Sequence, residues 1–263
     1  MAQRPRALVV RSAGTNCDAE TAFVLEQCGA TATIVPAEPF LARPAQLADY
    51  QLLAIPGGFS YGDDILAGKV FGLELATHAG EEIVKLVQRG GAAIGICNGF
   101  QILVQMGLLP GMAKPFGAPE VTLTDNDVHK YQDRWVRMRV TSDRCAWLRK
   151  GETLAAPAAH GEGKLVPRDA TVRRRLHDEG HVVLRYVGPD GADDPPFPWC
   201  PNGAIDAIAG LTDRTGRILG LMPHPERHYF PWQHPTWTRD GLAEVTDGRR
   251  LFERGVQAVV TAG

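Results

Sequence analysis

Three features are missing from this 263-residue sequence: a long hydrophobic run, a dominant charge of one sign, and closely spaced cysteines. No run reaches the roughly 20 apolar residues that cross a bilayer, and the N-terminus carries no signal-length apolar region, so we expect an unexported protein without a membrane partner. Lys and Arg number 28 against 30 Asp and Glu, a formal net charge of -2. This balance gives no field to attract nucleic acid, which is therefore not expected as a partner.

The cysteines are few and scattered. Five are present, an odd number, and none forms a C-x-x-C pair. This pattern argues against a disulfide framework and against a zinc site, and it favours a reducing, cytoplasmic location. The length and the 44% of hydrophobic residues suit one large α/β domain, which we expect to span residues 1–263.

Strand and helix patterns alternate through the first half of the chain. Such alternation predicts an open, mainly parallel sheet with helices on both faces, which binds its ligands at the carboxyl ends of the strands. Shorter strands beyond Gly107 predict an added antiparallel or mixed portion. We expect strands at residues 7–10, 32–35, 52–55, 92–96, 121–123, 135–140, 182–187 and 218–222, and helices at about 16–28, 69–89 and 247–260.

The most specific local pattern is residues 95–101 (GICNGFQ), where an apolar strand runs into a helix. Cys97 lies on the turn, with glycines two residues before and two after it. A turn this sharp holds its central residue in strained backbone geometry and lifts the side chain above the sheet, where the first N–H groups of the helix favour thiolate over thiol. The turn therefore predicts that Cys97 is a nucleophile, although a lone cysteine is more often a buried structural residue.

A candidate base follows another apolar strand, in residues 223–227 (PHPER). Because proline favours an extended residue before it, we expect His224 and Glu226 to project to the same side of an extended segment. Glu226 can then accept a hydrogen bond from one ring nitrogen and leave the other to take a proton from a thiol. No metal site is expected with His228, because residues four apart converge only on a helix, which Pro225 interrupts.

A glycine pair follows the strand at residues 52–55, in residues 56–60 (PGGFS). Paired glycines often form only a tight turn, and the common phosphate-binding patterns are absent. We expect an oxyanion site in which a backbone N–H of Gly58 or Phe59 acts together with the N–H of Asn98. Residues 160–163 (HGEG) lie in a turn-rich stretch and are either a surface turn or the edge of the site.

Together these motifs resemble the class I glutamine amidotransferases, whose fold is an open α/β sheet. Residues 14–18 (GTNCD), 56–63 (PGGFSYGD) and 160–163 make the chain similar to one branch of that family, the glutaminase subunits of phosphoribosylformylglycinamidine synthase in purine biosynthesis. The resemblance implies that L-glutamine is the substrate and that its side-chain amide is attacked by the nucleophile. It implies roles for four residues: Cys97 as nucleophile, His224 and Glu226 as its assistants, and Gln101 as a substrate-holding residue.

The resemblance also implies a division of labour between subunits. Ammonia would pass to a separate synthetase subunit, which would bind ATP, magnesium and formylglycinamide ribonucleotide. No metal and no cofactor would be bound by this chain, and a small third subunit is compatible with the pattern.

Alternatives stay open at this stage. A glutaminase can feed a different synthetase, and a cysteine hydrolase of the DJ-1/PfpI type shares the elbow turn, although that family usually has histidine directly after the cysteine, where this chain has Asn98. A non-catalytic subunit would predict loss of the nucleophile, the base or its carboxylate, and all three are present. Residues 188–203 and the aromatic residues 229–239 lengthen the chain and are either packed loops or a partner surface.

Overall fold

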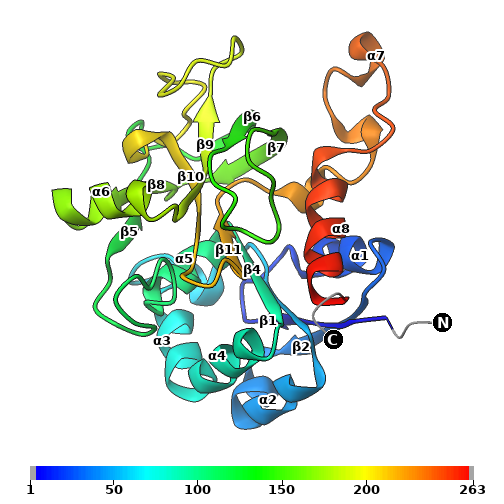
Figure 1. Ribbon diagram of the computed structural model, residues 1–263, viewed down its shortest axis with the longest axis vertical. Coiled ribbons are helices and arrows are strands. Elements are labelled where there is room, and N and C mark those ends of the chain that lie inside the picture. The colour runs from blue at the N-terminus through cyan, green and yellow to red at the C-terminus, as the bar shows by residue number, and fades with distance from the viewer. Residues whose placement is uncertain (1–3, 261–263) are drawn as a thin grey trace.

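The structure is a computed structural model that describes residues 4–260; the first three residues, on which the expectation about the N-terminus partly rests, lie outside it. A nine-stranded sheet of order β2-β1-β3-β4-β11-β10-β9-β6-β7 runs through the molecule (Figure 1), and β5 and β8 form a separate antiparallel pair. The strands are β1 (Arg6–Arg11), β2 (Thr31–Pro36), β3 (Leu52–Ile55), β4 (Ala92–Ile96), β5 (Val121–Thr124), β6 (Gln132–Val140), β7 (Thr153–His160), β8 (Lys164–Pro167), β9 (Val182–Val187), β10 (Ile208–Thr212) and β11 (Ile218–Leu221).

Helices cover both faces of the sheet. Figure 1 shows α1 and α8 together on one side, and α2, α3, α4 and α5 on the other. The α-helices are α1 (Asp18–Gln27), α2 (Ala37–Ala42), α3 (Lys69–His78), α4 (Gly80–Gln88), α5 (Asn98–Gln105), α6 (Ala170–Asp178), α7 (Trp237–Asp240) and α8 (Asp247–Val260), and the 3-10 helices are η1 (Pro44–Asp49), η2 (Ser60–Asp63), η3 (Ile205–Ala207), η4 (Pro225–Arg227) and η5 (Pro231–Gln233).

The parallel half of the sheet comprises β2, β1, β3, β4 and β11. Strands β3, β4 and β11 are short and buried along their whole length, as is required when helices cover both faces. Because these strands run in one direction, the loops that follow β1, β3, β4 and β11 meet at one edge. This edge carries the candidate site.

The other half is antiparallel and confirms the mixed portion that the sequence predicts. It contains β10, β9, β6 and β7. Strand β7 was not expected; Thr153–His160 pairs with β6 along its length, and the turn expected at residues 160–163 follows it as a bend at residues 161–162. Pro157 lacks an N–H group and is tolerated here because β7 is an edge strand.

Two further expectations need correction. The single helix expected over residues 69–89 is two helices, α3 and α4, because Ala79 between them has a non-helical φ of −120°. Helices α2 and α6, in segments interpreted as connections, were not expected. The aromatic tail leaves the body of the molecule, with α7 near the tip of the excursion (Figure 1). Within residues 4–260 we find no helix with the length and apolar character needed to cross a membrane.

Candidate active site

The turn between β4 and α5 has the strained form that its sequence predicts. Cys97 lies at φ 52° and ψ −108°, in the half of backbone space that residues with a side chain rarely adopt. A Cβ on Gly99 would lie 1.8 Å from the carbonyl oxygen of Ile55, so no larger residue fits there. Cys97 is 7% exposed, and its thiol donates to the carbonyl oxygen of Ala159 at 3.6 Å.

His224 and Glu226 are paired and buried, as the sequence predicts. The Nδ1 of His224 lies 2.6 Å from the Oε1 of Glu226. Since a carboxylate can only accept, Nδ1 donates and Nε2 is left as the acceptor of the neutral ring. The expectation of an extended segment is wrong, because Pro225–Arg227 form the 3-10 turn η4, whose first position suits the fixed φ of proline.

The backbone of His224 is held by the antiparallel half of the sheet. Its N–H donates to the carbonyl oxygen of Pro157 on β7 at 2.7 Å. Burial by itself lowers the pKa of His224, but the Glu226 carboxylate and the thiol of Cys97 outweigh burial and raise that pKa well above its usual range. The site therefore stabilises an imidazolium, the form that results when the ring takes a proton from a thiol.

A pocket of about 250 Å³ opens onto Cys97 and His224. Gly58, Phe59 and Gln101 also line it, whereas the side chain of Asn98 is buried behind it. The Asn98 amide accepts from the backbone N–H of Ser60 at 3.1 Å and donates to Gln101 Oε1 at 3.0 Å, and so ties the loop after β3 to helix α5. Its own backbone N–H is one of the first of α5, which have no intrahelical partner.

The glycine loop after β3 differs from the expected oxyanion site in one respect. The N–H of Phe59 donates to the carbonyl oxygen of Gly14 at 2.9 Å and is therefore occupied. We find no acceptor for the N–H of Gly58 among the described residues. Gly58 has a φ of +150°, and a Cβ there would lie 2.6 Å from the Gly14 oxygen. Of the two candidate donors, only Gly58 is unoccupied in this conformation.

Residues 160–163 lie at the edge of the pocket, which decides between the two interpretations of this motif. His160 and Glu162 both line the pocket, and the Glu162 carbonyl accepts from Gln101 Nε2 at 2.6 Å. Burial lowers the pKa of His160 to about 3, with the charge of His224 acting in the same direction. Burial therefore keeps His160 neutral, and the pKa values of the two pocket histidines are shifted in opposite directions.

Two carboxyl groups line one part of the pocket. Burial raises the pKa of Asp63 and of Glu162, and Glu162 belongs to the motif that the sequence already offered as an edge of the site. Asp63 itself was missed, as were Cys17, Tyr131 and Arg227, which also line the pocket. Asp63, Cys17 and Arg227 lie inside motifs that were singled out for other residues, whereas Tyr131 had no signal in the sequence.

Comparison with known proteins identifies the family. A model of the CobB/CobQ-like glutamine amidotransferase domain matches residues 4–259. The chain is 40% identical over 253 residues to phosphoribosylformylglycinamidine synthase subunit PurQ of Dehalococcoides mccartyi, covering 96% of each chain. It is 38% identical to the PurQ subunit of Treponema denticola, covering 86% of this chain and 88% of that one. The chain belongs to the PurQ family of glutamine amidotransferases.

A solved structure agrees with this assignment. A chain in the structure titled PurLQS from Thermotoga maritima is 32% identical, has a TM-score of 0.71, and is matched over 98% of this chain and 99% of that one. These findings confirm the resemblance and the α/β fold that the sequence predicts. They also exclude the alternative of a DJ-1/PfpI-type hydrolase. The roles of individual residues stay predictions.

Proposed function

We propose that this chain is the glutaminase subunit of a phosphoribosylformylglycinamidine synthase, which hydrolyses L-glutamine to glutamate and ammonia and passes the ammonia to a separate synthetase subunit. One observation carries the chemistry: a strained Cys97 opens onto the same pocket as His224, whose ring is bonded to Glu226. The membership of the PurQ family carries the choice of synthetase. A glutaminase feeding another synthetase is the remaining alternative.

In the proposed reaction, Nε2 of His224 takes the proton of the Cys97 thiol, and the thiolate attacks the side-chain amide carbon of glutamine. The His224 ring, stabilised by Glu226, then protonates the leaving nitrogen, which departs as ammonia. A water molecule then loses a proton to Nε2 of His224 and attacks the thioester. This step releases glutamate, and the proton returns to the sulfur of Cys97. Gln101, at the pocket wall, is proposed to hold the substrate.

The oxyanion of each tetrahedral intermediate needs two donors. We assign the N–H of Asn98 as one and an N–H from Gly58 or Phe59 as the other. A turn of the Gly58–Phe59 peptide would release the Phe59 N–H from Gly14, and Gly58 has no Cβ to oppose it. Because loss of one such donor costs about 3 kcal/mol, or about a hundredfold in rate, docking of the synthetase can switch the site on through this peptide.

The remaining requirements are placed outside this chain. We propose that ATP, magnesium and formylglycinamide ribonucleotide bind to the synthetase subunit and that no cofactor binds here. The related structure named PurLQS supports such an assembly. We include a small third subunit in the proposal. We propose a cytoplasmic location, which suits the five free thiols.

The test is reconstitution with the synthetase subunit of the same organism. Glutamine hydrolysis is measured for the chain alone and with the partner loaded with ATP, magnesium and formylglycinamide ribonucleotide. We expect turnover to rise about a hundredfold on docking and to match the yield of formylglycinamidine ribonucleotide.

Ammonium chloride provides the control, since it should support the synthetase without this chain. In the complex, Cys97→Ala should abolish the glutamine-dependent reaction and leave the ammonia-dependent one intact. Hydrolysis that couples to a different synthetase and not to this one would overturn the assignment of the partner. No glutamine hydrolysis in any complex would overturn the proposed function.

A further inference from the structure

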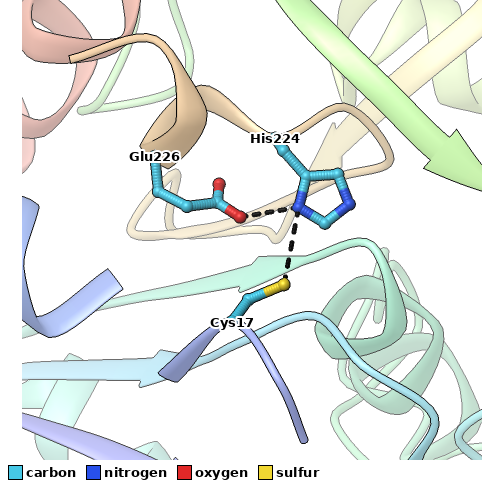
Figure 2. Close-up of side chains that lie close together, drawn as sticks. All are labelled: Cys17, His224 and Glu226. Carbon is cyan, nitrogen blue, oxygen red and sulfur yellow. Dashed lines mark hydrogen bonds and ion pairs between the residues drawn. The ribbon is translucent and has the colours of Figure 1, made fainter. Parts of the chain in front are cut away.

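A second thiol lies beside Nδ1 of His224, the ring nitrogen that exchanges no proton with Cys97 in the proposed reaction. Cys17, which directly precedes α1, has its Sγ 3.9 Å from Nδ1 of His224, and that nitrogen is the one bonded to Glu226 (Figure 2). Within the described part of the chain, this is the one group of three potential metal-ligating side chains whose ligand atoms all lie within 4.8 Å of one another. Thiolate, imidazole and carboxylate are each known zinc ligands.

The spacing of the three donors suits a tetrahedral ion after small shifts. With metal bonds of about 2.0 to 2.3 Å, ligand atoms around tetrahedral zinc lie about 3.3 to 3.8 Å apart. The sulfur–nitrogen distance of 3.9 Å is already close to that range. The nitrogen–oxygen distance of 2.6 Å must open by about 0.7 Å to reach that range, as it would if an ion replaced the shared proton.

A buried, unused acceptor is a second sign of a ligand at this position. Glu226 is 2% exposed, and its Oε2 has no hydrogen-bond partner among residues 4–260. Figure 2 shows that Oε2 points away from Cys17, so an ion would be bound through Oε1. Because a buried carboxylate with an unpaired oxygen is costly, the charge of a cation at Oε1 would offset part of that cost. Cys17 and His224 both line the pocket, so an ion can reach them from there.

Two neighbours restrict which ion can bind. The Cys17 sulfur accepts from Nη2 of Arg227 at 3.0 Å and donates to Oδ1 of Asn16 at 3.1 Å. The guanidinium charge opposes any cation, so only an ion that gains strongly from a thiolate bond can compete. Glu20 accepts from Nε of Arg227 at 2.8 Å and can keep that side chain when it releases the sulfur.

We propose that Cys17, His224 and Glu226 form an inhibitory site for a thiophilic divalent cation such as Zn²⁺ or Cd²⁺, separate from Cys97. Binding displaces the thiol proton of Cys17 and the Nδ1 proton of His224, and both leave to solvent. The metal-bound ring is a weaker base at Nε2 and no longer takes the proton of Cys97. The inhibition rests on the proposed function, whereas the binding site does not.

Binding is tested without reference to activity. Cd²⁺ is titrated into the Cys97→Ala chain in chelator-free buffer, and the ultraviolet charge-transfer band of the cadmium–thiolate bond is followed. In Cys97→Ala we expect a band that saturates at one equivalent of Cd²⁺. The band should be absent from Cys17→Ala/Cys97→Ala and unchanged in Cys28→Ala/Cys97→Ala. A band that is absent from Cys97→Ala but present in Cys17→Ala places the ion on Cys97 and overturns the proposal.

Inhibition is tested separately in the reconstituted enzyme. Zn²⁺ should suppress glutamine hydrolysis reversibly, with recovery on adding a chelator, and Cys17→Ala should raise the half-inhibitory concentration at least tenfold. Thermal unfolding checks that the variant is folded, and Cys17→Ser replaces it otherwise. Equal inhibition of the folded variant and the parent overturns the inhibitory role. An enzyme without metal-free activity would instead count against the proposed function, and the cadmium titration would still report on the site.

Discussion

Cys17 and Cys97 both stand directly before a helix at the carboxyl end of a parallel strand, and both line the same pocket. Their backbones differ. Cys97 has a φ of 52°, whereas Cys17 has an ordinary φ of −104°. Cys17 also lies beside Nδ1 of His224, which already carries a proton donated to Glu226, so that nitrogen cannot deprotonate it. A thiol near a histidine is a candidate nucleophile only if the ring nitrogen that faces it can accept a proton. Proximity to the ring is not sufficient.

The largest effect should separate these two cysteines. Cys97→Ala is expected to lower glutamine turnover by about 10⁴-fold or more, because the covalent path is lost, whereas Cys17→Ala should stay within a few-fold of the parent. An electrophilic glutamine analogue should add its mass to Cys97 alone, as read by peptide mass spectrometry. Labelling that persists in Cys97→Ala, or that moves to Cys17 in the parent, would contradict the comparison.

The next effect concerns Glu226, the carboxylate that determines which ring nitrogen of His224 carries the proton. Glu226→Gln should reduce turnover by about 10²- to 10⁴-fold with little change in KM, because the neutral amide no longer fixes the tautomer or stabilises the imidazolium. Steady-state kinetics of the complex measure both constants. Glu20→Gln is the matched control, since Glu20 binds Arg227 rather than the ring. Unchanged turnover in Glu226→Gln would remove Glu226 from the proposed triad.

The smallest effect extends the comparison to the two pocket histidines. Because the pKa of His160 is about 3, the unfolded chain binds a proton between pH 6.5 and 3 that the folded chain does not. The free energy of unfolding should therefore fall as the pH falls through this range, by up to about 1.4 kcal/mol per pH unit from this group. His224, with its raised pKa, acts in the opposite sense, and its stabilising contribution is lost only as the pH rises through the folded value.

Urea unfolding at pH 7 and pH 5 measures this slope. His160→Asn should lose less stability than the parent between the two pH values. His78→Asn, an exposed site on α3, should follow the parent. An identical slope in the parent and His160→Asn would show that His160 is not held neutral.

Local signals in the sequence were sufficient for the parallel strands and for the strained turn at Cys97. The apolar strand before Cys97 and the glycines around it dictate their own geometry, and the 3.6-residue period marks α8 from Asp247 to Val260. His224 and Glu226 pair as expected, although across a 3-10 turn and not in the extended segment that proline was expected to impose. In each case the deciding residues are within a few positions of one another.

Features that depend on distant partners were not predictable in this way. The alanine-rich β7 is a strand because β6 lies beside it, and nothing in its own sequence requires this. Cys17 lies 207 positions from His224, so their proximity is a product of the strand order. The occupied N–H of Phe59 depends in the same way on the loop that contains Gly14.

The edge strand β7 holds both sides of the site. Its Pro157 carbonyl binds the N–H of His224 at 2.7 Å, its Ala159 carbonyl accepts from the thiol of Cys97 at 3.6 Å, and its Ala155 carbonyl accepts from Nδ1 of His228 at 2.8 Å. When an amide exchanges with deuterium only after its hydrogen bond opens, its exchange rate measures how often that bond opens. The exchange rate of the His224 amide therefore reports how often the backbone of His224 separates from β7 when no substrate is bound.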